Sequence, residues 1–455
     1  MLPANDVKGE RTAFSLSKGR TLPLSERRNE KKQKENRRKT EGGNMKVLDR
    51  LISYVKVDTQ SSEESGTHPS TEKQFVLARQ LERELRELGA KDVRLSEHCY
   101  VYARIPSNLS AEENMHTPTF GLIAHMDTSP SASGKDVKPR VIRSYDGSPI
   151  PLGHGAILDP GIFPQLLSAK GDDLLVTDGS TLLGADDKAG VAEIMQCIEE
   201  LLSQPERRHG EICIAFTPDE EIGSGADFFD LAGFGAEVAY TVDGGTLGGI
   251  EYENFNAASA VLTIHGVNVH PGSAKDKMLN ALLIAMEFNA LLPPCTPANT
   301  EGYEGFFHLM SMKGDESLAE LRYIIRDHDR EKFEEKKRQF QSAADRLNEK
   351  YRSGGAALEA QLTDSYYNMK EKLEPYPYLI DCAKEAFRSC GVKPETLPIR
   401  GGTDGAKLSF MGLPCPNLST GGENYHGIYE YLNINAMEKM VEVLKKLTEE
   451  MIGRK

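Results

Sequence analysis

The amino-acid sequence predicts an α/β fold: a three-layer domain in which helices cover both faces of a mixed, mainly parallel sheet, and a smaller inserted α+β domain. Two observations support this prediction. Short apolar runs alternate with helical patterns from Met45 to about residue 254, and the same pattern returns after residue 368. Between residues 255 and 367, partly alternating strands and a long charged helix indicate a separate antiparallel sheet with its own helices.

These changes of pattern divide the chain into four segments. Residues 1–44 hold 12 Lys and Arg against 6 Asp and Glu, a net charge of +6. Because the whole chain has a formal net charge of −14, the remaining residues carry a net charge of −20. We expect this segment to be a basic, disordered extension. A nucleic-acid-binding arm, or a natural start at Met45, are the alternatives. Residues 45–254 and 368–455 form the two parts of the main domain, and residues 255–367 form the inserted domain.

Local patterns predict the individual elements. Thr71 and Gln74 form a candidate capping box at the start of a helix that ends at Gly89. Apolar periodicity then predicts, in chain order, strand 120–124, helix 191–201, strands 212–216, 238–242 and 260–264, helix 280–292, strand 323–325, helix 333–351, strand 358–362 and helix 436–451.

Composition excludes several classes of protein. The seven cysteines are scattered and form no C-x-x-C pair, which argues against a disulfide framework or a thiolate metal site and favours a reducing cytoplasm. No apolar run is long enough to span a bilayer, and the N-terminus lacks the apolar core of a secretory signal. Because the body of the chain is acidic, we expect neither nucleic acid nor a membrane as its partner.

Histidine and acidic residues follow the expected strands, at the ends where open α/β sheets bind ligands. Singly, each is more often an ordinary surface side chain. Together, so many carboxylates at one sheet edge need a cation, and imidazole with carboxylate suits a hydrolytic Zn²⁺, Mn²⁺ or Co²⁺ site. The residues are His125, Asp127, Asp186, Asp187, Glu220, Glu221, Asp243 and His426.

Seven motifs occur in an order that carries a family resemblance. They are His125-Met-Asp-Thr128, Thr181-Leu-Leu-Gly-Ala-Asp-Asp-Lys188, Thr217-Pro-Asp-Glu-Glu221, Tyr240-Thr-Val-Asp243, His270-Pro-Gly272, Arg400-Gly-Gly-Thr-Asp-Gly405 and Asn424-Tyr-His-Gly427. From about Met45 onward the chain resembles the peptidase T (tripeptide aminopeptidase) family, within the co-catalytic zinc exopeptidases that include dipeptidases, carboxypeptidases and N-acyl amino acid deacylases. The stretches 255–259 and 300–305 resemble peptidase T specifically.

The resemblance implies two metal ions per chain, with zinc as the default and manganese or cobalt as alternatives. The implied ligands are Asp186 as the bridge, His125 and Asp243 on one metal, and Glu221 and His426 on the other. Glu220 is then the general base, and Asp127 supports His125. Asp187 competes for the bridging role, but the family places the bridge at the first Asp.

Two further residues are candidates for substrate binding. His270 could stabilise the negative oxygen of a tetrahedral intermediate, and it would reach the site only by domain closure or from a neighbouring subunit. Arg400 opens a Gly-rich loop and could clamp a substrate carboxylate at a set distance from the metals. Such a clamp would select peptides by length.

We therefore expect a tripeptide aminopeptidase that acts on short peptides through a water between two metals. The alternatives on the same fold are a dipeptidase and an N-acyl amino acid amidohydrolase. A non-catalytic protein is the contrasting class, and it should have lost Glu220 or a metal ligand, whereas all are present. By family resemblance, the inserted domain acts as a lid and joins two chains into a homodimer.

Overall fold

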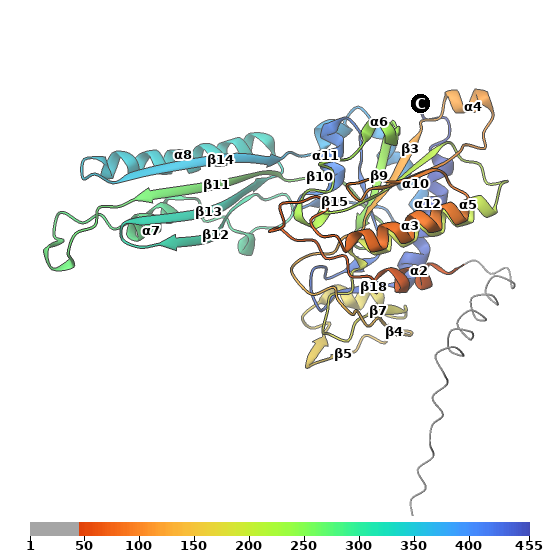
Figure 1. Ribbon diagram of the computed structural model, residues 1–455, viewed down its shortest axis with the longest axis horizontal. Helices are drawn as coiled ribbons and strands as arrows, with labels where there is room; N and C mark the ends of the chain where they lie inside the picture. The colour runs from red at the N-terminus through yellow and green to blue at the C-terminus, as the bar shows by residue number, and fades with distance from the viewer. Residues whose placement is uncertain (1–44) are drawn as a thin grey trace, which may run out of the picture. The chain divides into compact units, whose positions relative to one another are not determined.

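The computed structural model describes residues 45–455 of the chain (Figure 1), so the predictions for residues 1–44 lie outside the described residues. Residues 46–455 form one compact unit. Within the described part of the chain, no helix combines the length and the apolar character needed to cross a membrane.

A mixed sheet of eight strands forms the centre of the main domain, in the order β1-β2-β8-β3-β9-β16-β10-β15. Strands β8, β3, β9 and β16 are parallel to their neighbours within this group, β10 is parallel to β15, and the other pairs are antiparallel. The strands are β1 Lys91–Leu95, β2 Val101–Ile105, β3 Phe120–His125, β8 Ile212–Thr217, β9 Val238–Gly244, β10 Gly249–Asn254, β15 Glu395–Ile399 and β16 Asn417–Ser419.

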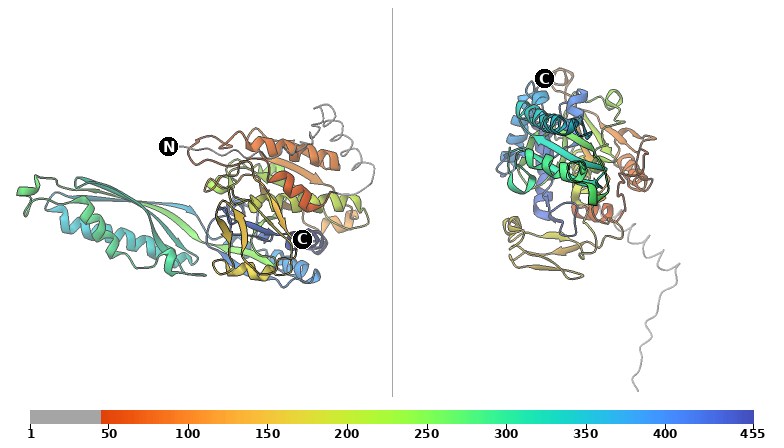
Figure 2. Two further views of the ribbon diagram at one scale, coloured as in Figure 1. Left: turned by 90° about the horizontal axis from the view of Figure 1, so that it is seen from below. Right: turned by 90° about the vertical axis from the view of Figure 1, so that its left-hand side faces the viewer.

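Helices cover both faces of this sheet, as Figures 1 and 2 show. Alternate residues of β3 explain why: Leu122 packs into one apolar core, and Ile123 packs into another on the opposite face. The first core is closed by α2 Val47–Tyr54, α3 Gln74–Leu88, α5 Ala185–Ser203, α10 Pro377–Ser389 and α12 Ile434–Glu450, and the second by α6 Leu231–Phe234 and α11 Asp404–Met411. The predicted three-layer arrangement is confirmed.

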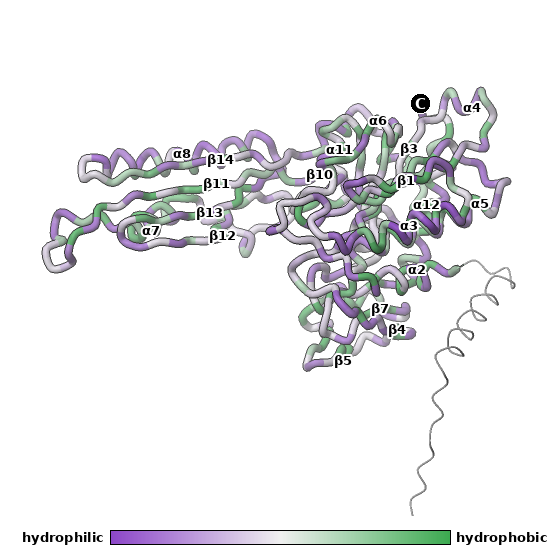
Figure 3. Tube along the Cα trace, viewed as in Figure 1, coloured by the Kyte–Doolittle hydropathy of each residue, from purple (hydrophilic) through white to green (hydrophobic). Residues whose placement is uncertain are grey.

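A second, antiparallel sheet lies within the segment that the sequence sets apart, with the strand order β12-β13-β11-β14. Its apolar core is separate from the apolar cores of the main domain. Figure 3 shows the contrast between the hydrophilic α8 and the hydrophobic α7. The elements are β11 Asn256–His265, α7 Ala281–Leu291, β12 Phe306–Gly314, β13 Leu318–Asp327, α8 Arg330–Arg352 and β14 Ala357–Tyr366. We call this part of the structure the lid.

Several short elements were not predicted. One small sheet, β17-β18-β7-β4, joins the chain after residue 420 to the strand that precedes α5. Strands of two to four residues are too short to show a periodic pattern. The additional elements are α4 Ala111–Met115, β4 Arg140–Ile142, β5 Ile150–Gly153, β6 Ala156–Leu158, β7 Leu174–Val176, α9 Lys370–Leu373, β17 Gly422–Glu423, β18 Tyr431–Asn433 and the 3₁₀ turns 164–169, 220–222, 271–273 and 297–299.

The predicted capping box of α3 is wrong. The helix begins at Gln74 with Lys73 at the N-cap position, and no side chain caps it. The Gln74 amide is buried and instead donates to Asp219 Oδ1 at 2.6 Å, across to the turn that follows β8. The predicted stop at Gly89 is confirmed, because this glycine has the left-handed φ of 95° that helix ends commonly need.

Glu193, in the middle of α5, is a buried acid without a partner. Its exposed fraction is 0%. Neither carboxyl oxygen has a hydrogen-bond partner among the described residues. Burial therefore raises the pKa of Glu193 well above its usual value of 4.5.

We expect Glu193→Gln to stabilise the protein increasingly as the pH rises above about 4.5. In the wild type the unfolded chain ionises Glu193 while the folded protein keeps it neutral, so stability is lost with rising pH until the folded pKa is reached. The difference in unfolding free energy should grow by about 1.4 kcal/mol per pH unit over this range. Denaturant unfolding of both proteins at several pH values measures it, and a difference that does not change with pH would contradict the account.

Candidate metal centre

Three neighbouring parallel strands bring the candidate residues to one edge of the sheet. Strand β3 ends at His125, which pairs with Thr217 at the end of β8, and β9 lies on the other side of β3. Asp243 lies near the end of β9, while Glu220 and Glu221 occupy the turn after β8. Because these strands run in one direction, their carboxyl ends converge, as the sequence predicts.

The Asp186 carboxylate lies between two imidazoles. Its Oδ1 is 3.0 Å from His125 Nε2, and its Oδ2 is 3.1 Å from His426 Nε2. On the outer sides, His125 Nε2 is 3.4 Å from Asp243 Oδ1, and His426 Nε2 is 2.8 Å from Glu221 Oε2. The five predicted ligands thus form two groups that share Asp186.

Asp127 holds both His125 and the turn that carries the two glutamates. Its Oδ1 lies 3.3 Å from His125 Nδ1. The same carboxylate accepts hydrogen bonds from the backbone N–H of Glu220 at 3.0 Å and of Glu221 at 3.3 Å. One buried side chain therefore fixes the orientation of the imidazole and the position of both glutamates.

The Asp187 carboxylate is held by backbone N–H groups, whereas Asp186 contacts both imidazole rings. The Asp187 carboxylate accepts from the backbone N–H of His125 at 3.1 Å and of Gly190 at 3.2 Å. A Cβ at position 190 would lie 1.8 Å from the carbonyl oxygen of Val242, so only glycine allows α5 to approach β9 this closely. The geometry therefore favours Asp186 over its neighbour as the bridging carboxylate.

The centre concentrates negative charge away from water. Burial raises the pKa of Glu220, and it raises the pKa of Glu221 and of Asp243 to about 7. The carboxylates of Asp186 and Glu221, which accept hydrogen bonds from the His426 ring, raise the pKa of His426 to about 11. These three acids disfavour ionisation and the imidazole favours protonation, as expected of a carboxylate cluster that needs positive charge.

The residues present fit divalent cations. Ligand atoms of His125, Asp186 and Glu221 lie within 4.8 Å of one another, and so do those of His125, Asp187 and Asp243. The donors are imidazole nitrogens and carboxylate oxygens, the set that suits zinc and related hydrolytic metals.

Two supporting residues had no predicted role. Glu430 is buried and accepts from the backbone N–H groups of Leu183, Gly184 and Asp186 at 2.7, 2.9 and 3.1 Å, so it shapes the turn that carries the bridging carboxylate. Asp404 accepts from Thr217 Oγ1 at 2.9 Å. Asp404 stands in the quoted motif 400–405, whereas nothing in the sequence sets Glu430 apart.

A cavity of about 650 Å³ opens beside the centre. It has room for a short peptide, since ligand pockets usually measure about 300–1,000 Å³. Its walls come from the main domain and from the end of β14, and they include Asp186, Glu220, Glu221, Asp243, Tyr366, Ile399, Gly401, Gly402, Thr403, Asp404, Lys407, Tyr425 and His426.

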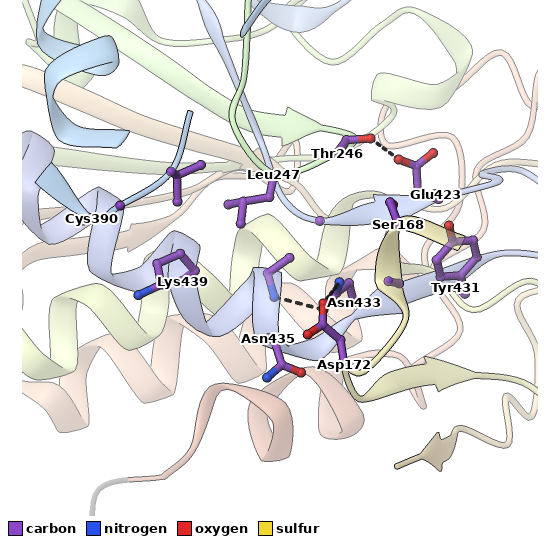
Figure 4. Close-up of a pocket in the computed structure, with 15 residues that line it drawn as sticks. Ser168, Asp172, Thr246, Leu247, Cys390, Glu423, Tyr431, Asn433, Asn435 and Lys439 are labelled. Carbon is purple, nitrogen blue, oxygen red and sulfur yellow. Dashed lines mark hydrogen bonds between the residues drawn. The ribbon is translucent and has the colours of Figure 1, made fainter. Parts of the chain in front are cut away.

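A second cavity, of about 460 Å³, is lined by none of the candidate ligands (Figure 4). Its lining includes Gly421 and Glu423, which precede His426 in the chain. Glu423 bonds to Thr246 there, and Asn433 donates to Asp172 at 2.8 Å. These bonds fix the base of the loop that carries His426.

The two predicted substrate-binding residues lie outside the metal cluster. His270 follows the far end of β11, about 30 Å along the strand from the linker at residue 256. Its Nδ1 accepts from the backbone N–H of Gly272. Arg400 turns toward the lid and bonds to the backbone of residues 300–304. A clamp on a substrate carboxylate would require Arg400 to give up these bonds.

The mixed sheet gathers imidazoles and carboxylates beside a cavity of peptide size, an arrangement that suits a hydrolase of the peptidase class. The chain belongs to peptidase family M20/M25/M40, whose model matches residues 179–450. A curated relative named Peptidase T, from Clostridium novyi, is 53% identical over 406 residues, which cover 89% of this chain and 98% of the relative.

Solved structures show the same fold. An aminopeptidase PepT from Bacillus cereus superposes with a TM-score of 0.70 at 22% identity, covering 89% of this chain and 98% of that one. A Bacillus subtilis protein described as a dinuclear metal-binding peptidase of the M20 family superposes with a TM-score of 0.58 at 14% identity, covering 88% and 97%.

We expect Glu430→Gln to weaken metal binding about 10- to 100-fold, the usual effect of losing support behind a ligand. The amide NH₂ would face at least one of the backbone N–H groups that the carboxylate now accepts from. Competition with a metal-binding dye measures the affinity. Glu442→Gln is the control, because Glu442 pairs with Lys439 at the surface of α12. Equal affinities in the two variants would contradict the role of Glu430.

Proposed function

We propose that the protein is a tripeptide aminopeptidase that depends on two metal ions, with zinc as the default. The observation that carries this proposal is the Asp186 carboxylate between His125 Nε2 and His426 Nε2, with Glu220 beside it. Its relatives named Peptidase T support the substrate class, and the B. subtilis structure supports a pair of metals.

In this proposal His125 and Asp243 would hold one metal, Glu221 and His426 would hold the other, and Asp186 would serve both sites. When bound, the two ions lower the pKa of a water molecule and polarise the peptide carbonyl. The side chains of the protein provide the remaining functions, which are to keep each ligand oriented and to move the proton.

Glu220 is the proposed general base. It lines the cavity, its Oε2 lies 3.9 Å from His125 Nε2, and its backbone N–H is fixed by Asp127. Burial raises the pKa of Glu220, which brings a carboxylate closer to the range in which it can both accept and return a proton near neutral pH. Its carboxylate takes a proton from the attacking water and passes it to the nitrogen of the leaving amine.

We propose that two chains form a homodimer through the lid. His270 is far from the metal centre of its own chain, so it would complete the site of a second copy of the chain. Leu283 and Met286 on α7 are 64% and 58% exposed, and such apolar side chains suit a protein interface.

The seven free cysteines fit a reducing cytoplasm as the compartment of the protein.

The substrate class is tested with di-, tri- and tetrapeptides and N-acetyl amino acids. We expect the highest kcat/KM for tripeptides with a free N-terminus, and activity that is lost on chelation and restored by added zinc. Activity on the acetylated compounds alone would instead indicate an amidohydrolase, and a preference for dipeptides would indicate a dipeptidase.

We expect Glu220→Ala to keep about two metal ions per chain while kcat falls about 10²- to 10⁴-fold, the usual contribution of a positioned general base. Glu221→Ala is the matched variant on the neighbouring residue, and it should lose metal. Elemental analysis of the purified proteins beside steady-state kinetics separates the two roles. If Glu220→Ala lost metal and Glu221→Ala kept it, the assignment of the pair would be reversed.

We expect Met286→Asp to convert a dimer into monomers, because the buried charge would have no partner in an apolar interface. Sedimentation velocity measures the species. Met115→Asp is the control, since Met115 is 67% exposed on α4 of the main domain. A wild-type protein that sediments as a monomer would contradict the proposed dimer.

A further inference from the structure

Arg400 is bound to the lid by four hydrogen bonds. Its Nη1 donates to the carbonyl oxygens of Gly302 at 2.8 Å and Glu304 at 3.1 Å. Its Nη2 donates to the carbonyl oxygen of Thr300 at 3.2 Å and to Thr300 Oγ1 at 3.0 Å. The acceptors all belong to the stretch 300–305, which the sequence analysis singled out and the proposed chemistry does not use.

Aromatic rings of the lid lie under the same guanidinium. The Arg400 carbon Cζ is 5.1 Å from the centre of the Phe255 ring and 5.7 Å from that of Phe306. Guanidinium groups are attracted to such ring faces at distances below about 6 Å. The lid therefore surrounds the Arg400 guanidinium with carbonyl oxygens and aromatic ring faces, which together form a binding site for it.

Arg400 lies in a strap, residues 399–403, whose other four residues line the substrate cavity. Two other residues of the lid also contact this strap. His328 Nε2 lies 3.1 Å from the carbonyl oxygen of Ile399. The Tyr366 ring packs so closely on Gly402 that a Cβ there would lie 2.9 Å from it.

The other end of the strap is tied to the catalytic turn. Thr403 caps α11, where the next residue, Asp404, accepts from Thr217 Oγ1 at the end of β8. Glu220 follows three residues later in the chain. A continuous path of contacts therefore runs from the lid through the strap to the turn that carries the proposed base.

The two linkers between lid and main domain are stapled together by asparagine side chains. Asn368 Oδ1 accepts from the backbone N–H of Asn254 at 3.2 Å, and Asn254 Oδ1 accepts from that of Met369 at 2.7 Å. Asn256 Oδ1 in turn accepts from the backbone N–H of Asn368 at 3.0 Å. The linkers thus join the two parts at one place, and His328, whose carbonyl oxygen accepts from the Asn368 side chain at 3.1 Å, connects this junction to the strap.

We propose that Arg400 is a positioning residue, a latch that binds the 300–304 backbone and holds the lid against the cavity wall. This inference rests on the proposed peptidase function, and it replaces the direct clamp on a substrate carboxylate. A latch holds the strap in place before substrate arrives, so it acts on every substrate alike. A clamp would act only on substrates that carry a free C-terminal carboxylate.

The test compares a tripeptide with its C-terminal amide. We expect Arg400→Ala to lower kcat/KM about 10²-fold for both, the cost of a displacement of about 1 Å in a catalytic site. The acid-to-amide ratio should stay at its wild-type value. Thr300→Val removes one acceptor and keeps the shape of the side chain, so it should lower both rates about fivefold, as expected for one hydrogen bond. Arg338→Ala, an exposed lid arginine that pairs with Glu335, is the control and should have no effect.

Hydrogen exchange provides a readout that does not need activity. In Arg400→Ala and Thr300→Val, the amides of residues 300–306 and 399–403 should exchange faster, while those of β3 and β8 stay protected. A collapse of the acid-to-amide ratio in Arg400→Ala, with Thr300→Val at the wild-type level, would overturn the latch in favour of the clamp. Unchanged rates and exchange in Arg400→Ala would overturn it as well. A wild-type protein that cleaves neither peptide would refute the proposed function, and exchange would still decide the latch.

Discussion

The burial of several carboxylates around two imidazoles is the constraint on which the rest of the structure depends. Negative groups at this density are unstable away from water unless positive charge and hydrogen-bond donors surround them. The protein supplies the donors from its backbone: Asp127, Asp187 and Glu430 each accept two or three N–H groups from neighbouring turns. The missing positive charge is what a pair of divalent cations would provide.

The lid is joined to the main domain through the chain, and it also contacts the wall of the substrate cavity. It has its own apolar core and is joined to the main domain through two linkers that asparagine side chains hold together. Arg400 of the strap contacts the lid, and His328 and Tyr366 of the lid contact the strap beside the cavity. The wall that receives the substrate is therefore shared between the two parts of the structure, which links lid position to the geometry around Glu220.

Much of the fold and of the cluster could be predicted from local sequence. The buried strands β3, β8 and β9 are continuous apolar runs, and the residues just after them converge because the strands are parallel. His426 is different: it lies in an irregular loop with a left-handed φ of 65°, and only its motif identified it. Glu430, Gln74 and the latch could not be predicted, because their partners are backbone or side-chain groups more than 90 residues away in the chain. Such pairings depend on the finished fold and leave no local pattern.

The most direct test of the two-metal account is anomalous diffraction from crystals of the protein grown with zinc, recorded at the zinc absorption edge. The account predicts two peaks per chain, one beside His125 and Asp243 and the other beside Glu221 and His426, with Asp186 in contact with both. A single peak, or two peaks bridged by Asp187 instead, would contradict it.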